Sequence, residues 1–222
     1  MRIELCGETL ELHADRALHW PRRRTLIVAD VHLGKGAAFR RAGLAIPSGD
    51  TRRDLARLDA LIAAFSPERL LVLGDLFHAP LLESESWFAD VDRFRARHVS
   101  LALEVLRGNH DRVLHRVPPG WRIDWHEGAR HEPPFVFAHE PRDDDRGYGM
   151  AGHLHPVLTL RSSTDRLRMP VFWLRERHAV LPSFGGFTGG YGITPGPDER
   201  VYAVTPDGVM EIPETRTRKG SP

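Results

Sequence analysis

Short apolar runs alternate with helical stretches in the first half of the chain, and this alternation restricts the fold more than any other feature. The runs Thr25–Ala29, Arg69–Leu73 and Val99–Leu106 have the length of buried strands. Between them, residues 50–65 carry apolar side chains at helical spacing, and the acidic, aromatic segment Glu83–Arg97 predicts a second helix. Strands and helices in this order predict an α/β fold with a parallel sheet and right-handed crossovers.

Strands also dominate the prediction outside this region. The segments Arg2–Cys6 and Thr9–His13 predict a hairpin at the start of the chain, and Ala17–Trp20 predicts a further short strand. After residue 120, more short strands are expected at Trp121–Trp125, Phe135–Ala138, Val157–Leu160, Val171–Leu174 and Val201–Val204. We therefore expect a single domain over residues 1–213, followed by a disordered polar tail over residues 214–222.

Two connecting segments are rich in glycine. Residues Gly34–Gly49 predict a loop that ends at Asp50, which is placed to cap the following helix. Residues Ser183–Gly192 combine glycine with aromatic side chains, and two interpretations of them stay open. They form either a tight connection or one wall of a pocket.

Composition narrows the class of protein without choosing a substrate. The 222 residues carry a formal net charge of +1, which argues neither for nor against nucleic acid as a partner. The single cysteine, Cys6, excludes an intrachain disulfide and fits a reducing compartment. Residues 1–13 lack the apolar core of a signal peptide, and no run approaches the ~18 apolar residues of a membrane span. We expect a soluble cytoplasmic protein with no membrane partner.

Polar side chains follow the predicted strands at the points where the strands end. Asp30 and His32 follow the first strand of the alternating series, Asp75 follows the second, and Asn109 and His110 follow the third. Three histidines follow later strands in the same way: His139, His153 and His155. Ligands of open α/β sheets bind at such carboxyl ends.

These residue types indicate a metal centre. Oxygen and nitrogen ligands without cysteine suit manganese or iron, and zinc is also possible. One mononuclear site would not use so many candidates, whereas two metals ~3.5–4 Å apart that share a carboxylate would use them all. The competing interpretation is that each residue belongs to a polar turn or to the surface. That interpretation suits His13, His19, His98, His115, His126, His131 and His178, while His78 stays open.

The same motifs resemble a known family. Asp30-Val-His32, Gly74-Asp75, Gly108-Asn-His-Asp111, His139 and Gly152-His-Leu-His155 are similar to the motif set of the calcineurin-like metallophosphoesterase superfamily. This resemblance implies a four-layer α/β/β/α sandwich and a two-metal phosphoesterase.

The resemblance also implies roles for individual residues. One metal is held by Asp30, His32, Asp75 and His155, and the other by Asp75, Asn109, His139 and His153, so that Asp75 bridges them. His110 is implied as the proton-donating or charge-stabilising residue, with Asp111 as its orienting partner. Many relatives carry glutamate at position 111, so the aspartate of this chain has a shorter reach.

A narrower resemblance concerns the loops. The segment from Asp30 to Asp50, together with Ser183–Gly190, is similar to the bacterial ligase-associated DNA damage response endonucleases. This similarity implies a role in DNA repair, with a DNA ligase, a nuclease and a helicase as possible partners.

The expected activity is hydrolysis of phosphodiester bonds in DNA, by a water that two cations, most simply Mn, activate. Lys35, Arg40 and Arg41 follow the first ligand pair and are candidates for contact with DNA phosphates, although a solvated arginine-rich surface is the alternative. Four aromatic residues are candidates for stacking on unpaired bases, which favours single strands: Phe39, Phe184, Phe187 and Tyr191.

Two other functions stay open at this stage. The first is a phosphomonoesterase that acts on proteins, nucleotides or lipid precursors, because the metal motifs do not select the substrate. The second is a scaffold without catalytic activity, against which the retention of His110 argues.

Overall fold

The computed structural model describes residues 1–78, 80–114, 116–161 and 165–213, so His115 and the tail predicted over 214–222 lie outside the described residues. The first sheet has seven strands in chain order: β1 (Arg2–Leu5), β2 (Glu8–His13), β3 (Ala17–Trp20), β4 (Thr25–Val28), β5 (Arg69–Val72), β6 (Ala102–Leu106) and β7 (Ile123–His126). Strands β4 to β6 are parallel, as predicted, β7 also pairs in parallel with β6, and β1 to β4 are antiparallel.

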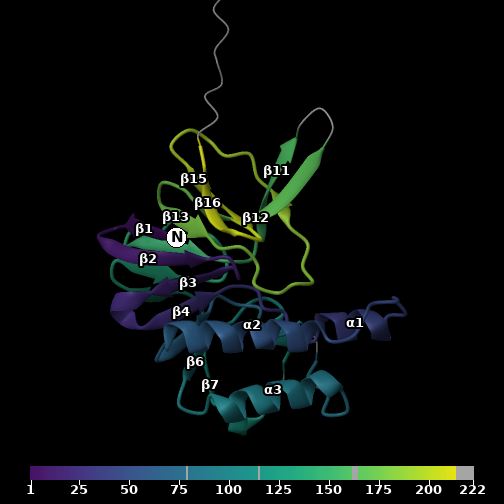
Figure 1. Cartoon of the computed structure of the whole chain (residues 1–222). Coiled ribbons are helices and arrows are strands. Elements are labelled where there is room, and N and C mark those ends of the chain that lie inside the picture. The colour runs from purple at the N-terminus through teal and green to yellow at the C-terminus, as the bar shows by residue number, and fades with distance from the viewer. Residues whose placement is uncertain (79, 115, 162–164, 214–222) are drawn as a thin grey trace, which may run out of the picture.

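Three α-helices connect the parallel strands: α1 (Lys35–Arg41), α2 (Asp50–Phe65) and α3 (Ser86–Arg97). Short 3₁₀ turns lie at Pro21–Arg23, Asp111–Val113 and Pro119–Trp121. Helices α2 and α3 lie on one side of the first sheet, and the second sheet lies on the other side (Figure 1). No helix of the described residues combines the length and the apolar character that a membrane crossing requires.

Two predictions for this region were wrong. The segment Gly34–Gly49 contains helix α1, whose seven residues are too few to show apolar periodicity between the glycines. Asp50 does not cap helix α2, because the N-cap residue is Gly49. The carboxylate of Asp50 instead accepts a hydrogen bond from the backbone N–H of Gly36 (3.0 Å), which ties the start of α1 to the start of α2.

The second sheet contains nine strands: β8 (Arg130–Glu132), β9 (Phe135–Phe137), β10 (Tyr148–Ala151), β11 (Pro156–Arg161), β12 (Arg166–Leu174), β13 (His178–Val180), β14 (Tyr191–Gly192), β15 (Arg200–Thr205) and β16 (Gly208–Ile212). Its order is β14-β11-β12-β13-β10-β9-β8, and β15 pairs with both β12 and β16. Most of the strands that the sequence did not predict, such as β8, β13 and β14, have only two or three residues.

Alternation along the strands explains the layers. In β4, Leu26 and Val28 pack against the helices, whereas Ile27 packs against the second sheet. A strand that is buried on both faces must be apolar throughout, which is why this run has no polar alternation. The α/β class and the sandwich of two sheets are therefore confirmed. The outer face of the second sheet packs Val171 and Trp173 in a further apolar cluster, and residues 122–213 contribute no helix to it in the described part of the chain.

Candidate metal centre

All seven predicted metal ligands meet where the two sheets present the ends of their strands. Asp30, Asp75 and Asn109 come from the ends of the parallel strands β4, β5 and β6. Their partners from the second sheet follow β9 and β10: His139, His153 and His155. Parallel strands end at one edge of a sheet, so the first three side chains are brought together by topology alone.

One group of ligand atoms forms around His32. Its Nε2 lies 3.3 Å from Nε2 of His155, which in turn lies 3.5 Å from Oδ1 of Asp30. Burial, and then the positive charge of Lys35, lower the pKa of His32 far below its usual range. The imidazole is therefore neutral, which is the form that binds a metal.

A second group forms around His139. Its Nε2 lies 3.0 Å from both Oδ1 of Asn109 and Nδ1 of His153. Its Nδ1–H donates to the backbone carbonyl of Leu73 (3.0 Å), which leaves the lone pair of Nε2 directed at the group. Asn109 is exposed, so this side of the centre is open to a substrate.

Asp75 lies between the two groups. Its Oδ2 is 3.9 Å from Nε2 of His32 and 3.7 Å from Nε2 of His139, so one carboxylate faces both. Its Oδ1 accepts the backbone N–H of His110 (2.9 Å), which fixes the orientation of the carboxylate. Burial raises the pKa of Asp75 above its ordinary value, a cost that a bound cation would offset.

The donor atoms fit divalent cations. Oδ1 of Asp30 is fully buried and has no hydrogen-bond partner among the described residues, whereas Oδ2 accepts the backbone N–H of His153 (2.8 Å). A buried carboxylate oxygen without a partner is costly unless a cation binds it. The centre offers only oxygen and nitrogen donors, which agrees with the expectation of manganese, iron or zinc.

The backbone of the centre is strained. Asp30, His32, Asp75, His153 and His155 all have φ between +50° and +68°, in the left-handed region that side chains with a Cβ rarely adopt. Each such residue costs roughly 1–3 kcal/mol, and such strain persists where the surrounding structure enforces it for function. Five proposed ligands share this conformation, which indicates that the loops are shaped to aim these side chains inward.

The backbone of Gly108 packs closely against Asp75. A Cβ at this position would lie 2.1 Å from Oδ1 of Asp75, so Gly108→Ala should displace that carboxylate and weaken metal binding by about tenfold or more. Metal titration followed by calorimetry measures the effect. Gly120→Ala is the matched control, since nothing lies within 4 Å of its Cβ. Equal metal affinity in both variants would show that the carboxylate tolerates displacement.

Asp111 stabilises the loops of the centre. It is fully buried, and its two carboxylate oxygens accept backbone N–H groups of Leu76 (3.3 Å), Phe77 (3.0 Å) and Gly108 (3.1 Å). The imidazole of His110 is not among its hydrogen-bond partners in the described residues. The resemblance implied Asp111 as the orienting partner of His110, but the carboxylate of Asp111 accepts backbone N–H groups instead. Any support it gives His110 passes through the backbone.

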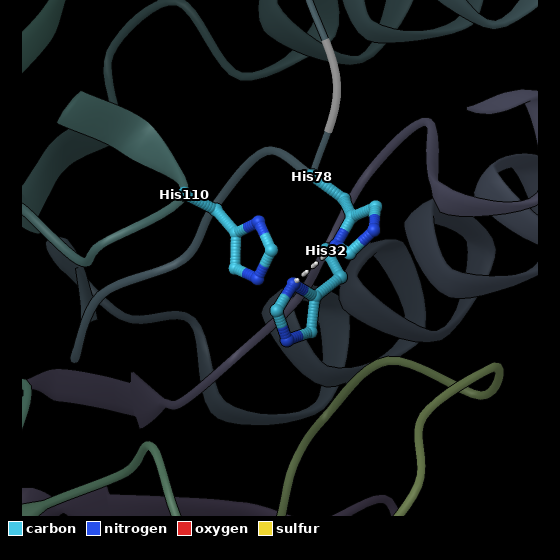
Figure 2. A group of neighbouring side chains, drawn as sticks. All are labelled: His32, His78 and His110. Atoms are coloured by element: carbon cyan, nitrogen blue, oxygen red, sulfur yellow. Dashed lines mark hydrogen bonds between the residues drawn. The ribbon is translucent and has the colours of Figure 1, made fainter. Parts of the chain in front are cut away.

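His78, whose role the sequence left open, lies in the centre. Figure 2 shows it beside His32 and His110, with Nδ1 3.3 Å from Nδ1 of His32. Its ring centroid is 4.3 Å from that of His110, at an interplanar angle of 33°. Burial, and then the charge of Lys35, lower the pKa of His78 to about 4, so the neutral ring can accept the Nδ1–H of His32.

The three candidate phosphate contacts have different surroundings. Lys35 is the first residue of α1. Burial lowers the pKa of its amino group, and the nearby carboxylates of Asp75 and Asp30 oppose this effect in part. Arg40 donates to the carbonyl of Pro47 (3.0 Å) and lies 3.7 Å from Asp50. Arg41 is ion-paired with Glu85. The charges of both arginines are thus engaged within the protein.

The glycine–aromatic segment lines a pocket beside the centre. Ser183 and Gly186 face this pocket together with His155. Phe184, a candidate for base stacking, is fully buried and lies 4.1 Å under the guanidinium of Arg57, so that prediction was wrong for this residue. Phe187 is half-buried and Tyr191 is exposed. All three aromatic residues have glycine neighbours in the sequence, so the sequence does not show which of them is buried.

A family model and one solved structure agree with this geometry. The family model of the calcineurin-like phosphoesterases matches residues 23–208. The solved structure of the nuclease MPE of Pseudomonas putida is 41% identical, with a TM-score of 0.82 over 92% of this chain and 96% of that chain. YfcE, a phosphoesterase from E. coli, is 15% identical, with a TM-score of 0.43 over 83% and 90%. A comparison with curated proteins found no match. The protein described here therefore belongs to the calcineurin-like phosphoesterase family.

Proposed function

We propose that this protein is a two-metal phosphodiesterase that cuts DNA internally and acts in DNA repair. The observation that supports this most is the position of Asp75, whose carboxylate faces two groups of ligand atoms at an edge left open beside Asn109. The similarity to a nuclease at 41% identity supports nucleic acid as the substrate. A ligase, a nuclease and a helicase remain possible partners on the strength of the resemblance alone.

The proposed ligand sets are those that the ligand atoms form around His32 and His139. One cation would bind Asp30, His32, Asp75 and His155, and the other Asp75, Asn109, His139 and His153, with manganese the first choice. Divalent cations bound there supply positive charge for the phosphodiester oxygens and activate water. The protein contributes neutral imidazoles as ligands and the fixed carboxylate of Asp75 between the two groups. It also contributes the imidazole of His110, which lies at the rim and would protonate the leaving oxygen.

Substrate contacts are proposed on the side of α1. Lys35 lies close enough to the carboxylates of the centre for their charges to act on it, and it is our first candidate for a phosphate contact. For Arg40 and Arg41, whose charges are engaged with Asp50 and Glu85, a contact requires that these ion pairs open. Phe187 packs on Phe39 with ring centroids 5.4 Å apart, which forms an aromatic surface for unpaired bases.

A metal-dependent activity panel tests this function. The chelated protein, reloaded with Mn²⁺, Fe²⁺ or Zn²⁺, should cut single-stranded DNA faster than duplex DNA and should hydrolyse a small aryl phosphodiester. Internal cutting is read from products of a circular single strand, which an exonuclease leaves intact. Hydrolysis of monoesters without diesters would favour the phosphomonoesterase alternative. Metal binding without hydrolysis of any substrate would favour the scaffold.

The same panel tests Lys35. Lys35→Ala should reduce the slope of log(kcat/KM) against log salt for single-stranded DNA by about 0.7, because one phosphate contact is lost. Hydrolysis of the aryl diester should change little. Arg93→Ala is the control, since that arginine lies on α3 outside the proposed contacts and is paired with Asp90. If Lys35→Ala lowers both activities equally and reduces the metal content, the residue supports the centre and does not contact DNA.

A further inference from the structure

A pocket of about 330 Å³ opens directly beside the metal centre. Its wall includes the proposed metal ligand His155, and its other lining residues include Arg16, Arg168, Ser183 and Thr188. The pocket therefore places two guanidinium groups next to a proposed metal ligand. These groups lie far apart in the sequence, so no local motif marks them.

The two arginines have unused binding capacity. Among the described residues, Arg16 donates through Nη1 alone, to the carbonyls of Ser183 and Gly185 (both 3.2 Å), and Arg168 donates through Nη2 alone, to the carbonyl of Gly190 (2.6 Å). Within the described ranges, no carboxylate lies within ion-pair distance of either guanidinium.

The acidic groups near Arg16 are already engaged. Asp15 and Asp54 act on its charge, but both are ion-paired with Arg57, at 2.9 and 3.1 Å. Burial, and then the charge of Arg57, lower the pKa of Arg16, which agrees with a guanidinium that lacks a neutralising partner. An anion in the pocket would supply that partner.

A second pocket shows that arginines alone do not make such a site. It measures about 380 Å³ and is lined by Arg52, Arg93 and Arg97 on α2 and α3. Each of these arginines is ion-paired, the first two with Asp90 and the third with Asp59. None of its lining residues belongs to the metal centre. Of these two pockets, the first alone joins unpaired cations to a proposed metal ligand.

The wall of the first pocket is fixed relative to the metal centre. The hydroxyl of Ser183 donates to the carbonyl of Asp30 (2.8 Å), and the N–H of Phe184 donates to the carbonyl of Ala29 (2.7 Å). An anion bound there would thus sit at a constant distance from the cations. Arg168 lies on β12, in the hairpin that projects from the body of the protein (Figure 1).

We propose that this pocket is a subsite for a second phosphate group of the nucleic-acid chain, the one next to the phosphate that is hydrolysed. The inference rests on the proposed function. Guanidinium groups bind phosphate oxygens through paired, charge-assisted hydrogen bonds. The subsite gives a polymer an advantage over a small diester, and it sets the strand's path from the metals towards the β11–β12 hairpin.

The test uses the metal-loaded enzyme and small substrates that differ by one phosphate. The parent compound is the nitrophenyl ester of thymidine 5′-monophosphate or of thymidine 3′-monophosphate. Each of the two derivatives carries an added phosphate on the other sugar hydroxyl, the 3′ hydroxyl in the first and the 5′ hydroxyl in the second. In the wild type, the added phosphate should raise kcat/KM about tenfold in one isomer. Arg168→Ala should abolish this gain and leave the parent diester unaffected. On single-stranded DNA, the salt slope should fall by about 0.7.

Controls separate the possible outcomes. Arg93→Ala, in the second pocket, should keep the full gain. Arg16→Lys retains a positive charge but loses the planar guanidinium that donates paired hydrogen bonds, so it should keep only part of the gain in kcat/KM. Lysine can still donate to the carbonyls of residues 183 and 185, which alanine cannot. The subsite is refuted if the added phosphate gives no gain in either isomer, or if Arg168→Ala retains it. Failure of the wild type to hydrolyse the parent diester would instead refute the proposed function.

Discussion

Asp75→Asn should remove both metals from the protein and lower kcat/KM for phosphodiesters by more than 10³-fold. The carboxylate of Asp75 faces ligand atoms of both groups, so its charge contributes to both. Loss of one group that stabilises charge in a transition state costs about 10²–10³-fold, and here two cations would lose a shared ligand. Elemental analysis of the variant after metal loading gives the stoichiometry, and a small aryl diester gives the rate.

The asparagine variant should still fold, because its carbonyl oxygen can accept the N–H of His110 as the carboxylate does. His155→Ala is the matched comparison: it removes a ligand that belongs to one group only, and it should impair one metal while the other stays bound. Two tightly bound metals in Asp75→Asn would refute the bridging role. Complete loss of metal from His155→Ala would show that the two sites do not fill independently.

Much of the centre could be predicted because its ligands are placed by strand topology. Asp30, Asp75 and Asn109 follow three apolar runs that pair in parallel register, so their proximity follows from the order of the elements. The second sheet is less predictable, since strands of two or three residues have too few side chains to show a period. The histidines after β9 and β10 were found through their motifs.

Contacts between distant segments could not be predicted. His78 reaches His32 across 46 positions, and Arg16 reaches the carbonyls of residues 183 and 185 across more than 160. The periodicity of apolar residues predicts a single helix or strand, and it does not show which loops lie next to one another in the fold. The charge of Arg41 illustrates the same limit, because its partner Glu85 follows a different strand. An arginine-rich segment therefore does not establish free positive charge.

The position of His110 differs from that of the seven proposed metal ligands. Its imidazole is half-exposed at the rim, edge-on to His32 with ring centroids 5.2 Å apart, and it packs on His78. Only its backbone N–H contacts Asp75. Removing the side chain therefore leaves the hydrogen bond from the backbone N–H to the carboxylate of Asp75 in place.

His110→Ala should therefore fold, retain both metals and lose activity by about 10²–10⁴-fold, the usual contribution of a general acid. The loss should be large for DNA, whose leaving oxygen needs a proton, and small for a nitrophenyl diester, whose leaving group departs as an anion. His110→Gln, which fills the same space without an exchangeable proton of suitable acidity, should behave like the alanine variant. A loss below about tenfold on DNA would place the proton donor elsewhere. An equal loss on both substrates would mean that His110 stabilises charge on the phosphoryl group and does not protonate the leaving oxygen.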